Sequence, residues 1–244
     1  MNLIIDIGNT FIKVFLFEKR KISFSQKISS SDIFKIFDLI NDFRKTEYTI
    51  VSSVVKLPEE FNQKARKYIQ KIIYLNENTK LPIINNYKSK TSLGKDRIAA
   101  AVGANTIFPD TNVLVIDAGT ALTIDFISEH NEYQGGNISP GIQMRFKALE
   151  TFTSKLPLLD KSEEFYLTAD NTNDAIISGV QNGIIFEMDA YINEYKKKYT
   201  DLKVILTGGD SFFFEYKLKN RIFAKPFLTA VGLNRILEYN AKQI

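Results

Sequence analysis

The sequence has 244 residues, of which 44% are hydrophobic and 25% charged, proportions typical of a soluble globular protein and not of a disordered or fibrous one. It contains no cysteine and one histidine, His130, which excludes disulfide scaffolds, thiolate zinc sites, cysteine nucleophiles and His-rich metal clusters. The 32 Lys and Arg residues outnumber the 28 Asp and Glu residues, but they are dispersed along the chain. Without a clustered basic stripe, we expect no nucleic-acid partner.

The N-terminal residues carry no feature of an export signal, because no basic region precedes the first apolar run and Asp6 interrupts it. No apolar stretch approaches about 18 residues, the length that a membrane-spanning helix needs. We therefore expect no membrane partner and a cytoplasmic location.

The first half of the chain reads as strands and helices in alternation. Short apolar runs bounded by turn residues indicate strands, whereas apolar residues at three- and four-residue spacing indicate helices. The expected elements, in chain order, are strands at 3–5, 11–17 and 21–28, a helix from about 31 to 40, a strand at 48–54, a helix at 59–69, a strand at 72–75 and a helix at about 94–107.

The second half repeats this order, which indicates a duplicated βββαβαβ unit. We therefore expect two lobes, residues 1–109 and residues 110–244, joined without a flexible linker. The expected elements of the second half are strands at 113–116, 122–127 and 133–138, a helix after Pro140, a helix at about 172–199, strands at 203–206 and 221–223, and a helix at about 226–239.

An Asp-x-Gly turn follows the first strand of each half, beginning at Asp6 and at Asp117. The glycine lets a ligand approach the main chain, whose amides can cradle phosphate oxygens, and the hydroxyls of Thr10 and Thr120 add donors. A carboxylate at the strand end is placed to hold a cation that neutralises the phosphates. A single copy would read as an ordinary hairpin turn, but two copies in matching positions favour a nucleotide site.

Three further segments have two interpretations each. The glycine-rich turns at residues 135–141 and 207–210 either shape a ligand cleft or merely turn the chain. The segment 94–97 begins a helix, where Asp96 is either a cap favoured by the helix dipole or, paired with Arg97, a base beside an anion clamp. The residues alone leave these alternatives open.

In order and spacing, the motifs together resemble type III pantothenate kinases, a family of the acetate/sugar kinase–Hsp70–actin superfamily. The resemblance covers nearly the whole chain, with departures at Lys95, where a small residue is common, and at Ala100, where Asn is common. The matching motifs are Asp6-Ile7-Gly8-Asn9-Thr10, Gly94-x-Asp96-Arg97, Asp117-Ala118-Gly119-Thr120-Ala121-x-Thr123-x-Asp125, Gly135-Gly136-x-Ile138-x-Pro140-Gly141, Thr172-x-x-Ala175-x-x-x-Gly179 and Thr207-Gly208-Gly209-Asp210.

The resemblance implies an α/β fold of duplicated RNase-H-like (actin-like ATPase) lobes, each a mixed five-stranded sheet with helices, and an active site in the cleft between them. It implies ATP-dependent phosphorylation of pantothenate, the first step of coenzyme A synthesis. The alternatives are another small-molecule kinase of the superfamily, such as a sugar kinase, and a non-catalytic nucleotide-binding regulator. The three carboxylates Asp6, Asp96 and Asp117 count against the regulator, because a pure binding module would not need them all.

The resemblance also assigns roles to individual residues. Asp96 is the general base, Asp117 the ligand of a monovalent cation (K⁺ or NH₄⁺), and Mg²⁺ accompanies ATP. Tyr87 and Thr172 also read simply as a loop aromatic and a helix N-cap. A homodimer that shares its substrate site is implied. The residues implied to contact ATP are Asp6, Ile7, Gly8, Asn9, Thr10, Phe11, Ile12, Lys13 and Thr120, and those implied to contact pantothenate are Tyr87, Gly94, Lys95, Asp96, Arg97 and Thr172.

Overall fold

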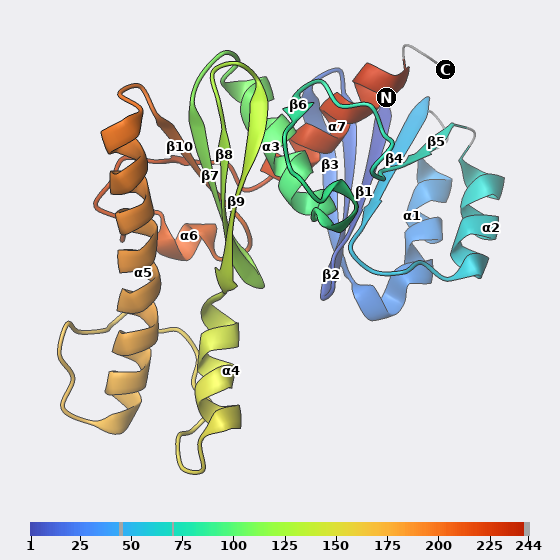
Figure 1. Ribbon diagram of the computed structural model, residues 1–244. Coiled ribbons are helices and arrows are strands. Elements are labelled where there is room, and N and C mark those ends of the chain that lie inside the picture. Colours follow the sequence, from blue (N-terminus) through green and yellow to red (C-terminus); the bar gives the residue numbers. More distant parts are fainter. Residues whose placement is uncertain (44–45, 70, 242–244) are drawn as a thin grey trace. The chain divides into compact units, whose positions relative to one another are not determined.

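The protein is described here by a computed structural model that covers residues 1–43, 46–69 and 71–241. The chain divides into two compact units (Figure 1). Unit 1 comprises residues 1–107 together with the last helix, α7 (Leu228–Ala241), and unit 2 comprises Phe108–Phe227.

Unit 1 is built on a five-stranded mixed sheet with the order β3-β2-β1-β4-β5. The central strand β1 is antiparallel to β2 and parallel to β4. Its apolar run Leu3–Ile5 is completely buried, as expected for a strand that is covered on both faces. The strands are β1 (Asn2–Ile7), β2 (Phe11–Glu18), β3 (Lys21–Ser29), β4 (Tyr48–Ser53) and β5 (Ile72–Tyr74).

The helices of unit 1 follow the predicted positions with one difference. The segment expected to be a single helix from residue 31 begins as a 3-10 helix, and α-helical geometry starts only at Ile36. Asp32 has non-helical backbone angles, which interrupts the first turn. The elements are η1 (Ser30–Lys35), α1 (Ile36–Asp42), α2 (Glu59–Tyr68), the short strand β6 (Ile84–Asn85), η2 (Lys90–Ser92) and α3 (Lys95–Ile107).

The last helix does not belong to the lobe in which the sequence placed it. The predicted second lobe ran from residue 110 to residue 244, whereas α7 packs on α3 in unit 1. Glycines allow the two helices to touch at the backbone: a Cβ atom at Gly232 would lie 1.7 Å from the Ala99 carbonyl oxygen, and one at Gly103 would lie 2.4 Å from that of Leu228. The contact joins segments about 130 residues apart, so no local pattern could reveal it.

Unit 2 repeats the topology of unit 1. Its strands follow the order β11-β10-β7-β8-β9, with β7 antiparallel to β8 and parallel to β10. Strands β7, β8, β9, β10 and β11 therefore correspond to β1, β2, β3, β4 and β5, which confirms the predicted duplication. The elements are β7 (Val113–Ala118), β8 (Ala121–Ile127), β9 (Glu132–Pro140), α4 (Ile142–Phe152), α5 (Thr172–Lys198), β10 (Lys203–Thr207), α6 (Ser211–Phe214) and β11 (Phe223–Ala224).

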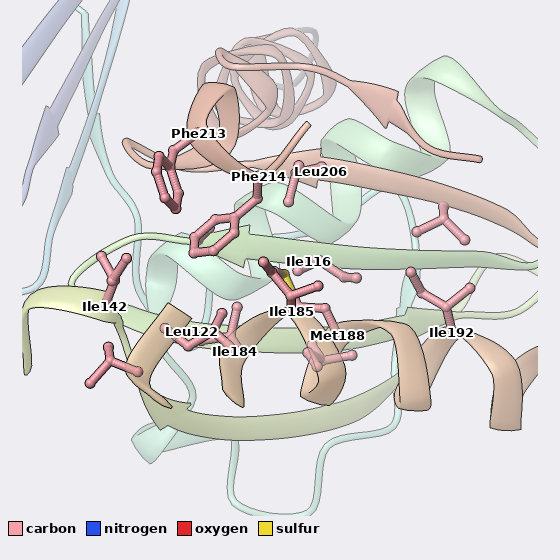
Figure 2. Packing of buried hydrophobic residues seen from close by; sticks show 14 of the residues in the cluster. Ile116, Leu122, Ile142, Ile184, Ile185, Met188, Ile192, Leu206, Phe213 and Phe214 are labelled. Atoms are coloured by element: carbon pink, nitrogen blue, oxygen red, sulfur yellow. The ribbon is translucent and has the colours of Figure 1, made fainter. Parts of the chain in front are cut away.

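The long helix α5 holds the sheet of unit 2 from one side. Figure 2 shows Ile184, Ile185 and Met188 of this helix directed at Leu122 of β8 and at Ile116 of β7. Burial of each such side chain contributes roughly 1.5–3 kcal/mol, so this face fixes the strands and the turns that follow them. No helix in the described part of the chain is long and apolar enough to cross a membrane.

Candidate functional site

The first Asp-x-Gly turn joins β1 to β2. Within the sheet, Asp6 is in register with Lys13 of β2 and with Ser52 of β4. The Gly8 amide donates a hydrogen bond to the Phe11 carbonyl at 3.0 Å, and the Ser30 hydroxyl donates to the Gly8 carbonyl at 2.9 Å. A Cβ atom at Gly8 would lie 3.1 Å from the Phe11 carbonyl oxygen, so the close approach of the two backbones favours glycine there.

The eight residues of this turn implied to contact ATP do not all present side chains to it. Asn9, Thr10 and Phe11 are exposed, whereas Ile7 and Ile12 are completely buried in the core of unit 1. The two isoleucines can therefore meet a ligand only through the main chain. Their side chains anchor the strand ends that hold the turn in place.

The carboxyl group of Asp6 is in an unusual electrostatic environment. Burial raises its pKa from 3.8 to about 6, the nearby positive charge of Lys13 lowers it, and the negative charge of Asp96 raises it. The hydroxyl of Ser52 favours the charged form. Because the charge of Asp96 acts on Asp6, unit 1 brings the carboxylate of the first Asp-x-Gly turn close to the predicted base.

Asp96 lies in the first turn of α3. Its Oδ1 atom accepts a hydrogen bond from the Arg97 amide at 2.9 Å. A Cβ atom at Gly94 would lie 2.5 Å from the same oxygen, so a larger residue there would displace the Asp96 carboxylate. The two interpretations of Asp96 are thus compatible: the side chain binds an amide at the helix N-terminus and still lies near Asp6.

Arg97 and Tyr87 come together in unit 1. The Arg97 side chain is buried, and its guanidinium carbon lies 5.6 Å from the centre of the Tyr87 ring. Tyr87 is held in turn by its amide, which donates to the Asn85 side chain at 3.0 Å. A buried, stacked guanidinium is well placed to bind an anionic group of fixed orientation. Lys95, the departure from the family pattern, instead lines a separate pocket next to β4 and α2.

The second Asp-x-Gly turn repeats the first in unit 2. Asp117 is in register with Thr123 of β8 and with Thr207 of β10, and the Gly119 amide donates to the Ala121 carbonyl at 3.1 Å. In each turn the glycine amide donates a hydrogen bond to the first residue of the next strand. The two halves therefore have the same turn geometry as well as the same strand order.

Two other glycine-rich segments pack on this second turn. The Gly141 amide donates to the Thr120 carbonyl at 3.2 Å, and the Asp210 amide donates to the Ala118 carbonyl at 2.9 Å. A Cβ atom at Gly141 would lie 2.4 Å from the Thr120 carbonyl oxygen. The sequence left open whether these turns shape a site, and the structure brings both to the second Asp-x-Gly turn.

The surroundings of Asp117 are rich in oxygen atoms. Gly208 has a positive φ of 97°, and a Cβ atom there would lie 2.5 Å from Asp117 Oδ1 and 2.4 Å from the Ala118 carbonyl oxygen. Carboxylate and carbonyl oxygens are the ligands that hard cations take in proteins, so the residues fit a monovalent cation. Among the described residues, no group of three or more His, Asp or Glu side chains is placed to hold a metal ion.

Thr172 begins α5 but does not cap it. The cap is Asn171, whose side chain accepts a hydrogen bond from the Asp174 amide at 3.0 Å, so the N-cap interpretation of Thr172 was wrong by one residue. Thr172 instead lines an apolar groove of about 760 Å³ between α4 and α5. The groove also includes Met144, Arg145, Leu149, Ile176 and Val180.

Sequence reasoning missed several polar residues around these turns. Ser52 had a detectable signal, because it ends an apolar strand that runs parallel to β1. Lys161, which forms an ion pair with Asp210, lies in an irregular segment and had none. The ion pair between Arg145 and Glu187, next to the turn at residues 135–141, joins α4 to α5 and was equally invisible.

Comparison with known proteins identifies the family. The family model of type III pantothenate kinase matches residues 2–194. A type III pantothenate kinase from Cytophaga hutchinsonii is 43% identical over 242 residues, covering 98% of this chain and 100% of that protein. Another from Bacteroides fragilis is 44% identical over 246 residues and covers 100% of both chains.

Solved structures agree at the level of the fold. A Campylobacter jejuni protein assigned to the Baf family of transcriptional activators has a TM-score of 0.64 and 24% identity, covering 98% of this chain and 99% of its own. A polyphosphate/ATP-glucomannokinase from Arthrobacter has a TM-score of 0.51 and 13% identity, with 100% of both chains covered. At these identities the likeness concerns the fold, which is that of the actin-like ATPases and sugar kinases. The chain belongs, by its sequence, to the type III pantothenate kinase family.

Proposed function

We propose that the protein transfers the γ-phosphoryl group of ATP to the primary hydroxyl of pantothenate, giving 4′-phosphopantothenate at the start of coenzyme A synthesis. The observation that carries the proposal is the proximity of Asp96 to Asp6 within unit 1, in a chain of this family. Asp6 begins the first Asp-x-Gly turn and Asp96 lies in the first turn of α3, so a carboxylate of the proposed ATP site lies near the proposed base.

Asp96 acts as the base in this proposal. The pantothenate oxygen attacks the γ-phosphorus, the bond from that phosphorus to the β,γ-bridging oxygen breaks, and ADP leaves. The hydroxyl proton passes to the Asp96 carboxylate late in the step, because the transition state of phosphoryl transfer is loose. Asp6 is a poorer base here, since its carboxyl group begins the turn expected to face phosphate.

We propose that Arg97 and Tyr87 form the centre of the pantothenate site. The guanidinium of Arg97 matches a carboxylate, which pantothenate carries, and the ring of Tyr87 keeps that guanidinium in place. Gly94 leaves room for the Asp96 carboxylate. Lys95 and Thr172 complete the proposed set.

The ATP residues are proposed to be the turn from Asp6 to Lys13 and Thr120. Mg²⁺ bound together with ATP would neutralise charge on the phosphates. A monovalent cation, K⁺ or NH₄⁺, is proposed at Asp117, where the carboxylate lies against the carbonyl of Ala118 and the turn at Gly208.

A homodimer is proposed, in which a second copy of the chain covers the groove between α4 and α5. The support is the apolar lining of the groove, the exposed Met144 within it, and the position of Thr172 on its wall. A shared substrate site would explain why a residue of the pantothenate set lies there. We place the enzyme in the cytoplasm, with its substrates.

Mass spectrometry of pantothenate incubated with ATP and the protein tests the function. The expected product is heavier than pantothenate by one phosphoryl group, with one ADP formed per product. A parallel panel of sugars and hydroxy acids separates the alternatives: phosphorylation of a sugar in place of pantothenate identifies another kinase. Nucleotide binding without any product identifies a regulator.

A further inference from the structure

The polar pocket of unit 1 that Lys95 lines is not accounted for by the proposed reaction. It has a volume of about 450 Å³ and lies where β4 and β5 end and α2 begins. Its apolar wall includes Val51 and Leu75. A pocket of this size holds a small organic molecule.

Three cationic side chains line this pocket: Lys56 after β4, Arg66 on α2 and Lys95 on α3. Glu59 is the one acidic side chain among the described residues of the lining, so the pocket carries a surplus of positive charge. In the parts of the chain that the structure describes, none of the three cations has an ion-pair partner. Their charge is therefore left for a ligand or for solvent.

Polar side chains complete the lining of the pocket. Tyr74 is one of them, although its Oη atom is shielded from solvent and has no hydrogen-bond partner among residues 1–43, 46–69 and 71–241. The amide of Asn62 and the hydroxyl of Ser53 supply further polar groups in the same wall.

We propose that this pocket binds a small phosphate monoester, with the phosphate held by Lys56, Arg66 and Lys95 and the organic part against Val51 and Leu75. A dianionic phosphate carries three acceptor oxygens, which matches three cations better than a single carboxylate does.

The site is distinct from the groups proposed for ATP. None of the residues from Asp6 to Lys13 belongs to the described lining, nor does Asp96. Lys95 alone is shared with the proposed pantothenate residues, and it immediately precedes the base. A ligand in the pocket would therefore contact the first turn of α3, through Lys95, without contacting the described residues of either Asp-x-Gly turn.

Isothermal titration calorimetry at matched ionic strength tests the proposal on the whole protein. The probes are inorganic phosphate, glycerol 3-phosphate and, as a carboxylate control, citrate. The variants are Arg66→Gln and Lys56→Gln, both at exposed positions, and the matched control is Lys67→Gln, which is exposed on the same helix but does not line the pocket. Thermal unfolding checks that each variant is folded.

We expect glycerol 3-phosphate to bind the wild type, and Arg66→Gln and Lys56→Gln each to weaken that binding by about tenfold or more, the usual effect of losing one charge-assisted hydrogen bond. Lys67→Gln should stay within about twofold. Unchanged affinity in both pocket variants, absence of binding to the wild type, or tighter binding of citrate than of glycerol 3-phosphate would overturn the proposal. Phosphate binding that ATP displaces and Arg66→Gln leaves intact would also overturn it, while leaving the nucleotide site standing. The assay needs no turnover, so its failure is separate from failure of the proposed kinase activity.

Discussion

At the scale of single residues, the buried carboxylate of Asp6 lowers the free energy of unfolding when it is ionised. Its pKa is raised to about 6 in the folded protein, chiefly by burial, against 3.8 for an ordinary aspartate. The folded state therefore binds this proton more tightly than the unfolded state. Ionised Asp6 destabilises the fold above pH 6, and this penalty fades as pH falls towards 4.

Replacing Asp6 with asparagine should accordingly stabilise the protein without ligand. The difference of 2.2 between the folded pKa and the ordinary value corresponds to about 3 kcal/mol at pH 8, and to less than about 1 kcal/mol at pH 4. Thermal unfolding of Asp6→Asn and wild type at both pH values measures this. A melting temperature that falls at pH 8, or a gain that is equal at the two pH values, would show that burial does not govern this group.

Individual residues were predictable from the sequence where a motif repeats. Asp6 and Asp117 stand out because the same turn occurs twice, and Gly94 because it lies two residues before the Asp-Arg pair. Ser52 and Lys161 were not found, because their proximity to Asp6 and Asp210 depends on strand pairing and on an irregular segment. Ser52 could have been noticed near the end of an apolar strand, whereas Lys161 has no distinguishing spacing.

At the scale of elements, the contact between α3 and α7 defines unit 1. Gly232→Ala would place a methyl group 1.7 Å from the Ala99 carbonyl oxygen, so the helices must separate. We expect a loss of about 1–3 kcal/mol in the free energy of unfolding, the usual effect of overpacking. Chemical denaturation provides the measurement.

Gly183→Ala on α5 is the matched control for this helix substitution. The nearest atom to its Cβ would be Arg145 Nη1 at 3.8 Å, an ordinary contact. Alanine is about 1 kcal/mol better than glycine inside a helix, so this variant should be as stable as the wild type or more stable. Equal effects at the two positions would show that helix propensity, and not the close approach of α3 and α7, explains the Gly232 result.

The oxygen atoms around Asp117 predict that the rate of phosphorylation depends on the monovalent cation present. Replacing Na⁺ with K⁺ at constant ionic strength should raise the rate of pantothenate phosphorylation, because the carboxylate and carbonyl oxygens suit the larger ion. Asp117→Asn should remove most of the difference between the salts. Equal rates of wild type in the two salts would rule out this role for the turn.

Element boundaries were largely predictable, whereas partners distant in the chain were not. The strands and helices occur close to the expected positions because apolar periodicity is local. The assignment of α7 to unit 1 depends on Gly103 and Gly232, which look like ordinary helical glycines until the two helices are seen together. The 3-10 start of the segment at Ser30–Lys35 likewise reflects the backbone angles of Asp32 and not its apolar spacing.

At the scale of the whole molecule, the groove between α4 and α5 predicts the oligomeric state. Light scattering should give a mass about twice the 27.9 kDa of one chain. Met144→Asp places a charge in the apolar groove and should yield monomers, whereas Tyr216→Asp, at an exposed position outside the groove, should not. A monomeric wild type at the concentrations used for assay would contradict the proposed dimer.

The central proposal for the whole molecule is that Asp96 is the base for phosphorylation of pantothenate. The most direct measurement is the turnover number of Asp96→Asn, followed as 4′-phosphopantothenate by mass spectrometry beside the wild type, with ATP binding and thermal unfolding as controls. Loss of a general base costs about 10²–10⁴-fold in rate, so we expect a decrease of that order with ATP affinity and melting temperature little changed. Turnover within a few-fold of the wild type would contradict the account, and the base would then have to lie elsewhere.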